Sequence, residues 1–269
     1  MFVISSGGAT GQPKAFQDSL AQFSYLLYGS TVLNKESSTT KVMAKQSTGF
    51  FLEVNKRIYF VTASHAVTNY LKVKANKNEF PESYNIYSHY SEEFNFITVP
   101  AVCMSNSLKI KQGLNYADVF TYEVTDKLNR FPASIVSLQN HRGNFITSKK
   151  DYGEIRIFGF PAKMNKIQND IIEIAPPYLF STKNFKLSEN FINQIEEETG
   201  IDSLRYEVQI KDSRVSPALG GFSGAPVFIQ NKPANRWEFL GILTAINPIR
   251  NSIYVVKKDK VIDAINSTE

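Results

Sequence analysis

Short runs rich in β-branched and aromatic residues recur along most of the chain, and they fall into two series separated by a polar stretch. The first series occupies residues 41–44, 49–54, 57–62, 84–87, 97–102 and 118–124. The second occupies residues 155–158, 170–175, 203–210, 227–229, 239–245 and 253–256. Such runs are typical of strands, and Asn55-Lys56 between two of them indicates a hairpin turn. Strands in two sets with few helices predict a mainly β protein built from paired barrels.

Three segments have helical rather than strand spacing. Phe16, Leu20, Phe23 and Leu27 lie at intervals of three and four, which predicts a packing helix over residues 13–28. Residues 188–199 carry apolar positions 191, 192 and 195 between a possible N-cap serine and a glycine stop, which predicts a helical insertion. Residues 258–265 suit a short amphipathic C-terminal helix.

These elements predict four regions along the chain. Residues 1–30 form an N-terminal extension with a helix, and residues 31–135 form the first barrel. Residues 136–152 form a linker, and residues 153–269 form the second barrel with a helical insertion at 176–200 and the C-terminal helix. A chain of 269 residues is long enough to bury a large apolar core in this arrangement, so its size alone requires no disulfide or metal ion.

Charge, cysteine content and hydrophobicity argue against several classes of protein. The net charge is +5, but the Lys and Arg residues are scattered, which argues against a nucleic-acid partner. Cys103 is the only cysteine, so no intrachain disulfide can form and a reducing compartment is expected. No segment resembles a secretory signal or a membrane span, so we expect a cytoplasmic protein without a membrane partner. No metal or cofactor is called for.

The stretch 220–226 (Gly-Gly-Phe-Ser-Gly-Ala-Pro) precedes the apolar run 227–229 and is the strongest candidate for chemistry. A serine between glycines can sit in a tight turn that exposes its hydroxyl and directs backbone N–H groups to one point. Taken alone, the stretch is equally compatible with a plain turn before a strand. Because a serine hydroxyl is a poor nucleophile near neutral pH, Ser223 needs a base and that base needs an orienting partner.

Three histidines could serve as the base. His65 follows the strand at 57–62 at a strand-to-helix corner, whereas His89 and His141 lie in polar, loop-like stretches. Asp118 opens an apolar strand and is the candidate orienting carboxylate. The alternative for each is a structural role: a hydrogen-bonded buried histidine and a strand-end turn residue.

The order His65, Asp118, Ser223 and the residues around them resemble the trypsin/chymotrypsin-fold serine proteases, most closely the disulfide-free bacterial branch that includes HtrA-like protease domains. The likeness lies in 62–65 (Thr-Ala-Ser-His), 117–119 (Ala-Asp-Val) and 221–226, with 47–51, 158–161, 240–242 and 253–256 similar to further family strands. It spans about residues 31–265. The resemblance implies two six-stranded antiparallel β-barrels of the chymotrypsin type.

The same resemblance implies roles for individual residues. Ser223 would be the nucleophile, His65 the general acid and base, and Asp118 the carboxylate that holds the histidine tautomer. The backbone N–H groups of Gly221 and Ser223 would form the oxyanion hole. The chain departs from the family at Phe222, where an aspartate or asparagine is usual.

A second departure is Ala225, where the family usually has glycine. The substrate pocket is expected to include Pro217, Leu219, Thr244, Ala245 and Ile246. Pro217 matches the position of the aspartate that attracts basic residues in trypsin, and Ile246 a glycine of digestive relatives. We therefore expect a shallow pocket for small or medium uncharged side chains.

Two function classes follow from these patterns. The first is a serine endopeptidase that hydrolyses peptide bonds in protein or peptide substrates through an acyl-enzyme, in regulated cytoplasmic proteolysis. The second is a catalytically inactive protease-fold module that binds peptides or partner proteins. An esterase is less consistent, because no Gly-x-Ser-x-Gly elbow lies on an alternating strand and helix pattern. The predicted helices at 13–28 and in 176–200 are candidate surfaces for a regulatory protein, or plain packing elements.

Overall fold

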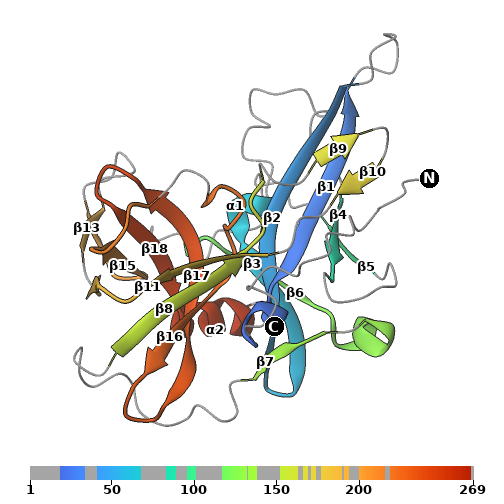
Figure 1. Ribbon diagram of the computed structural model, residues 1–269. Helices are drawn as coiled ribbons and strands as arrows, with labels where there is room; N and C mark the ends of the chain where they lie inside the picture. The colour runs from blue at the N-terminus through green and yellow to red at the C-terminus, as the bar shows by residue number, and fades with distance from the viewer. Residues whose placement is uncertain are drawn as a thin grey trace.

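Two curled antiparallel sheets contain most of the described residues of this computed structural model (Figure 1). The described residues are 19–33, 41–67, 83–88, 96–100, 117–131, 133–137, 152–162, 166–168, 171–173, 177–189, 191–193, 200–215 and 219–267. The chain is mainly β with few helices, as the sequence predicted.

The first sheet has seven strands, of which six follow the order β5-β4-β1-β2-β3-β6 and β7 pairs with β2 in parallel. Its strands are β1 (Tyr25–Leu33), β2 (Lys41–Val54), β3 (Arg57–Ala63), β4 (Ser83–Tyr87), β5 (Phe96–Pro100), β6 (Val119–Glu123) and β7 (Ile135–Ser137). The count exceeds the predicted six because the short β7 adds to the edge of β2.

The β2–β3 hairpin sets the position of the residues that follow it. Asn55 and Lys56 both have positive φ (52° and 67°), the conformation of the two-residue turn that matches strand twist. This turn pairs Val54 with Arg57 and, five residues further from the turn, Gly49 with Thr62. The end of β3 therefore lies beside the middle of β2.

The second sheet also has seven strands, in the order β11-β8-β16-β17-β18-β15-β12. They are β8 (Tyr152–Gly159), β11 (Tyr178–Thr182), β12 (Phe185–Ser188), β15 (Arg205–Ile210), β16 (Pro226–Asn231), β17 (Arg236–Asn247) and β18 (Ser252–Lys257). All neighbours in this sheet are antiparallel.

The other elements are short. Two small hairpins pair β9 (Lys166–Gln168) with β10 (Ile171–Glu173) and β13 (Phe191–Asn193) with β14 (Gly200–Asp202). The helices among the described residues are the 3-10 helices η2 (Ala21–Phe23) and η5 (Thr125–Arg130), and the α-helices α1 (Ser64–Val67) and α2 (Lys258–Asn266). In the described part of the chain, no helix has the length and apolar character needed to cross a bilayer.

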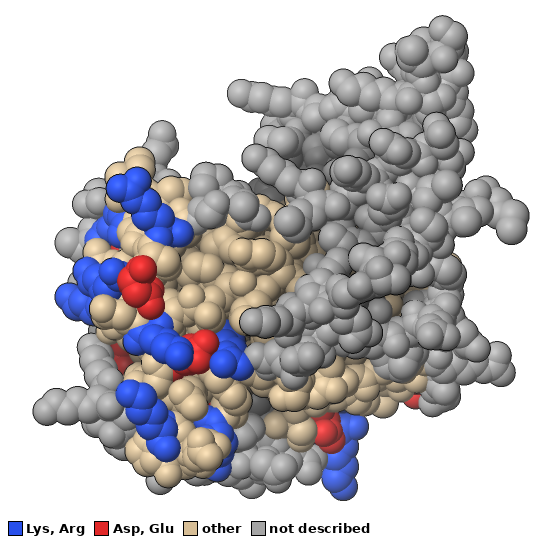
Figure 2. All heavy atoms as spheres, in the orientation of Figure 1, with Lys and Arg blue, Asp and Glu red and all other residues tan. Residues whose placement is uncertain are grey.

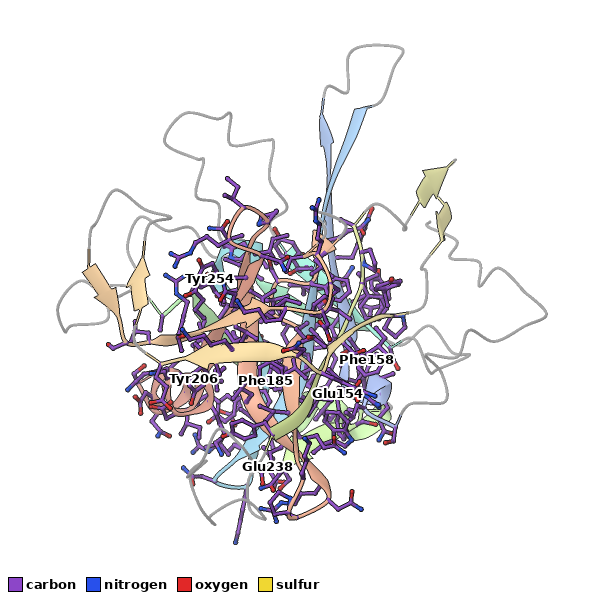
Figure 3. The ribbon with its side chains drawn as sticks, turned by 60° about the vertical axis from the view of Figure 1, so that its left-hand side comes forward. Glu154, Phe158, Phe185, Tyr206, Glu238 and Tyr254 are labelled. Atoms are coloured by element: carbon purple, nitrogen blue, oxygen red, sulfur yellow. The ribbon has the colours of Figure 1, made fainter. Side chains whose placement is uncertain are left out.

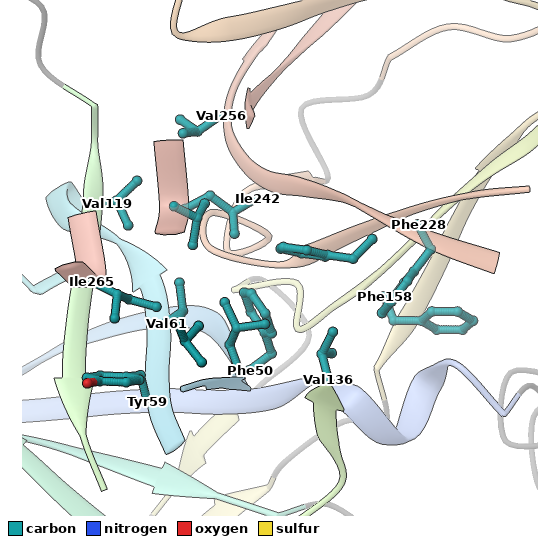
Figure 4. Packing of buried hydrophobic residues seen from close by; sticks show 14 of the residues in the cluster. Phe50, Tyr59, Val61, Val119, Val136, Phe158, Phe228, Ile242, Val256 and Ile265 are labelled. Carbon is teal, nitrogen blue, oxygen red and sulfur yellow. The ribbon is translucent and has the colours of Figure 1, made fainter. Parts of the chain in front are cut away.

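Alternating side chains divide the apolar interior into three cores. On β3, Phe60 faces the core of the first sheet while Tyr59 and Val61 face the opposite side. On β16, Val227 and Ile229 likewise face the core of the second sheet. The third core lies between the sheets and includes Phe50, Val61, Val119, Phe158, Phe228, Ile242, Val256 and Ile265 (Figure 4).

This junction core joins residues of both sheets and of α2. Phe50 of β2 lies 5.1 Å from Phe239 of β17, ring centre to ring centre. Val261 and Ile265 of α2 are fully buried in the same cluster, so the predicted C-terminal helix is confirmed and closes the junction. The two sheets therefore share one apolar contact rather than meeting through a polar linker.

The predicted N-terminal helix is wrong where the structure describes it. Residues 21–23 form one turn of 3-10 helix, and β1 begins at Tyr25. Tyr25, Leu26, Leu27 and Tyr28 are all buried, because β1 lies between β2 and β4. Apolar residues on both faces of a central strand imitate the spacing of a helix. Residues 13–18 lie outside the described residues.

The predicted helix at 188–199 is also wrong in its described part. Ser188 ends β12, and Phe191–Asn193 forms β13, which pairs with β14. Within the predicted helical insertion, residues 178–182 and 185–188 are instead β11 and β12, the two edge strands of the second sheet, which pair with β8 and β15. Backbone pairing with a distant strand overrides local helical spacing here. Residues 194–199 lie outside the described residues.

The predicted division into four regions stays a prediction. Two of the predicted boundaries fall within strands of the first sheet. β1 starts at Tyr25 and continues past the boundary at residues 30 and 31, and β7 (Ile135–Ser137) spans the boundary between the first barrel and the linker. Tyr152 is the first residue of β8.

Charged side chains on the second sheet are largely interspersed by sign. Figure 2 shows Asp and Glu among the Lys and Arg side chains of this region. Glu154 on β8 and Glu238 on β17, labelled in Figure 3, pair with Arg156 at 3.1 Å and Arg236 at 2.9 Å. The cations of this face are therefore partly neutralised by their neighbours.

Candidate active site

His65 and Asp118 form a doubly connected pair at the end of β3. The Nδ1 atom of His65 lies 2.6 Å from Oδ2 of Asp118, and the His65 backbone N–H donates to Oδ1 at 2.9 Å. The Ser64 N–H donates to the Asp118 carbonyl at 3.2 Å. Two contacts to the carboxylate and one to the main-chain carbonyl thus fix Asp118 against α1. Since the carboxylate accepts from Nδ1–H, Nε2 is the ring nitrogen left to accept a proton.

The exposure of this pair suits proton transfer. The Asp118 side chain is 18% exposed and the His65 side chain 39% exposed. The carboxylate is thus largely covered, while the imidazole reaches solvent. His89 and His141, the other two histidines, lie outside the described residues, as does Cys103.

The loop before β16 turns its carbonyl groups toward the protein. The carbonyl of Gly220 accepts from the Ala162 N–H at 2.8 Å, and that of Phe222 accepts from the Ala225 N–H at 2.8 Å. The Gly221 carbonyl accepts from the Thr48 hydroxyl at 2.9 Å. The carbonyl of Ser223 accepts from the Thr48 N–H at 3.1 Å and from the Ser47 hydroxyl.

Two amide donors of the same loop have no acceptor among the described residues: the N–H groups of Gly221 and Ser223. The intervening Phe222 N–H donates to Leu219 and the following Gly224 N–H to Leu243, at 3.0 and 2.7 Å. An unpaired backbone N–H is rare unless water or a ligand meets it. Two that alternate with paired ones make a candidate site for a developing negative charge.

The backbone of this loop requires glycine at two positions. Gly221 and Gly224 have φ of 98° and 86°, in the left-handed region. A Cβ atom on Gly221 would lie 2.4 Å from the Phe160 carbonyl oxygen, and one on Gly224 would lie 2.1 Å from Oγ1 of Thr62. The same added Cβ atom on Gly224 would lie 2.7 Å from the Ala63 nitrogen. The serine loop therefore lies against the strand that leads into His65.

Thr48 ties the two sheets together at this point. Its hydroxyl accepts from the Phe160 N–H at 3.0 Å while it donates to Gly221, and its own carbonyl accepts from the Thr62 hydroxyl at 2.8 Å. Thr48 is fully buried. Sequence reasoning treated residues 47–51 only as a strand and missed this contact; the available signal was the hydroxyl pair Ser47-Thr48 directly before the apolar run at 50–52.

The structure thus brings His65 into direct contact with Asp118 and brings the backbone of Ser223 to the same junction. The Ser223 hydroxyl makes no hydrogen bond with the described residues.

The predicted pocket residues are placed unevenly. Leu219 is 5% exposed and packs in the core of the second sheet. Thr244 is buried, and its hydroxyl donates to the Tyr254 carbonyl at 3.4 Å. Ala245 and Ile246 are half-buried near the end of β17, and Pro217 lies outside the described residues. Their role as a substrate pocket stays a prediction.

The described residues contain no group of three His, Cys, Asp or Glu side chains that could hold a metal ion.

The predicted mainly β class with two curled antiparallel sheets and few helices is confirmed and is consistent with a chymotrypsin-like fold, although each sheet has seven strands rather than the predicted six. No family model and no curated protein matches the sequence. Among solved structures, the chain is similar to a thermostable serine protease, AL20, from an extremophilic microorganism: the match covers 92% of this chain and 97% of that chain, with 11% sequence identity and a TM-score of 0.48. The site assignments depend on the contacts described above.

Proposed function

We propose that the chain is a serine endopeptidase with His65, Asp118 and Ser223 as its catalytic residues. The observation that carries the proposal is the combination of the His65–Asp118 pair with two amide donors, flanking Phe222, that have no acceptor in the described part of the chain. Neither a structural histidine nor a plain turn needs both features at one junction.

The reaction follows from these groups. Ser223 Oγ attacks the carbonyl carbon of the substrate peptide while His65 Nε2 takes the hydroxyl proton. The N–H groups of Gly221 and Ser223 donate to the oxyanion of the tetrahedral intermediate. The C–N bond then breaks, the leaving amine takes the proton from His65, and an ester to Ser223 remains. Water, deprotonated by His65, hydrolyses this ester and regenerates the hydroxyl.

Asp118 keeps the imidazole in the productive orientation through both steps. Its contact with Nδ1 places the proton of the neutral ring on that nitrogen and leaves Nε2 as acceptor. The carboxylate also stabilises the imidazolium that forms when Ser223 is deprotonated.

The substrates in this proposal are proteins or peptides, cleaved after small or medium uncharged residues. A reducing, cytoplasmic setting is part of the proposal, because Cys103 has no second cysteine to pair with. Control of the activity by a protein partner is compatible with it.

A fluorophosphonate probe tests the assignment directly. Wild-type protein should be labelled, Ser223→Ala should not, and Ser267→Ala, which changes an exposed serine after α2, should be labelled like wild type. Casein digestion that follows the same pattern would establish endopeptidase activity. A folded wild-type protein that takes no label would refute the proposal and favour the alternative of a peptide-binding module.

A further inference from the structure

We infer that Phe222 is a positioning residue that holds the two proposed oxyanion donors in place by anchoring the loop in the core of the second sheet. This inference rests on the proposed function, because the donors are the N–H groups of Gly221 and Ser223, on either side of Phe222. It assigns a task to the residue at which the sequence departs most from the proteases it resembles.

The ring of Phe222 is enclosed on more than one side. Its side chain is fully buried in the core cluster of the second sheet, with Leu219 and Ala225. A Cβ atom at Gly159 would lie 2.6 Å from the Cγ and Cδ1 atoms of the ring, so the ring occupies space that only glycine leaves open. The fit between Phe222 and Gly159 is therefore complementary.

Tyr178 covers the ring from the neighbouring edge strand. The two rings lie 6.3 Å apart, centre to centre, in an edge-to-face arrangement at 71°. Tyr178 pairs with Gly159 across the β11–β8 ladder and is itself 52% exposed. Cross-strand partners present their side chains on the same face of a sheet, so the Phe222 ring lies over Gly159 with the half-exposed Tyr178 ring beside it.

The backbone of Phe222 is fixed as firmly as its side chain. Its N–H donates to Leu219 at 3.0 Å and its carbonyl accepts from Ala225 at 2.8 Å. A rotation of the peptide between Phe222 and Ser223 would turn the Ser223 N–H away from a bound oxyanion. That rotation would break the bond with Ala225 and displace a ring that has no free space.

An anchor of this kind differs from a polar one. An apolar ring in a closed slot needs no ionic partner and no titrating group to hold the loop. The loop can therefore keep both N–H groups available in the chain as it is, without a charge created by cleavage or by a change of pH.

The test measures inactivation by a fluorophosphonate, whose phosphoryl oxygen occupies the oxyanion position, and separates the maximal rate kinact from the binding constant KI. Phe222→Ala should lower kinact by about 10²-fold, the effect of losing one oxyanion donor, with KI nearly unchanged. Phe228→Ala is the matched control. It deletes another buried ring, six residues further along the chain on β16, which packs in the junction core instead of the core of the second sheet. It should retain most of kinact wherever near-UV circular dichroism shows it folded.

A second set of variants covers the case in which Phe222→Ala does not fold. Gly159→Ala should lower kinact, because the added methyl group meets the ring. Combining it with Phe222→Leu, which frees space while staying apolar, should restore kinact above that of Gly159→Ala alone. Equal losses in Phe222→Ala and Phe228→Ala, or a double variant no faster than Gly159→Ala, would overturn the positioning role while labelled wild type leaves the proposed function intact. Unlabelled wild type would instead overturn both.

Discussion

The Nδ1 atom of His65 lies 2.6 Å from Oδ2 of Asp118, and the other carboxylate oxygen accepts the backbone N–H of the same histidine. One side chain therefore fixes both the ring and the main chain of the residue that carries it. Such a bidentate arrangement sets the direction in which Nε2 points.

Asp118→Asn should lower kcat by about 10⁴-fold, because an amide NH₂ facing Nδ1 selects the tautomer that carries its proton on Nε2. The amide oxygen can still accept the His65 N–H, so the fold should persist. Peptide hydrolysis and thermal unfolding of the variant check both statements. Asp126→Asn, an exposed change in η5, is the control and should hydrolyse at the wild-type rate. Near-normal turnover by Asp118→Asn would show that the carboxylate is not the orienting group.

Thr48→Val should both destabilise the protein and slow acylation. Valine has the shape of threonine but removes the donor to the Gly221 carbonyl (2.9 Å) and the acceptor of the buried Phe160 N–H (3.0 Å). Leaving the buried Phe160 N–H unpaired costs about 1–3 kcal/mol in free energy of unfolding. Urea denaturation measures this cost, and labelling with the probe measures the rate. Thr48→Ser keeps the hydroxyl and should stay close to wild type in rate; if the serine and valine variants behave alike, the hydroxyl has no such role.

Lowering the pH should weaken the hydrogen bonds by which Asp212 holds residues 182–184 of the second sheet. Partial desolvation raises the pKa of the Asp212 carboxyl, but hydrogen bonds from the Thr182 hydroxyl (2.7 Å) and from the N–H groups of Lys183 and Asn184 outweigh it and hold the pKa below its usual value. A lowered pKa in the folded state means that the carboxylate stabilises the fold above the unfolded-state pKa. This stabilisation is lost as the pH falls through the folded-state pKa.

Asp212→Asn should therefore have a lower Tm than wild type at neutral pH, and the difference should shrink as the pH is lowered below the ordinary range of aspartate. Scanning calorimetry across that range measures both. Because Asp212 is largely exposed, the difference is expected to be small. A Tm difference that stays constant with pH would mean that the charge of Asp212 does not contribute.

Much of the fold could be predicted from local sequence, since most strands carry β-branched and aromatic residues between turn signals. The order of His65, Asp118 and Ser223 also stands in the sequence. The stretch at 25–28 was misread as helix because both faces of β1 are buried, a fact set by its neighbours β2 and β4 and not by its own residues.

The contacts that shape the candidate site could not be predicted in the same way. The Thr48 hydroxyl meets the Gly221 carbonyl across 173 residues of sequence, and no local pattern encodes that meeting. In the sequence, Phe222 indicates only the loss of the aspartate or asparagine that the family usually has. In the structure, its ring is buried over Gly159. Contacts between residues that are far apart in the sequence determine both the Thr48–Gly221 bond and the burial of Phe222.

The tie between β2 and the serine loop makes the geometry of Ser223 a property of the whole chain. The carbonyl of Ser223 is held by Ser47 and Thr48, which belong to the opposite sheet. A fragment that contained only the second sheet would carry the serine and both glycines, yet would lack the groups that orient them. The proposed nucleophile is synthesised more than 170 residues after the residues that hold its backbone, so the serine loop gains its full set of contacts only when the second sheet docks on the first.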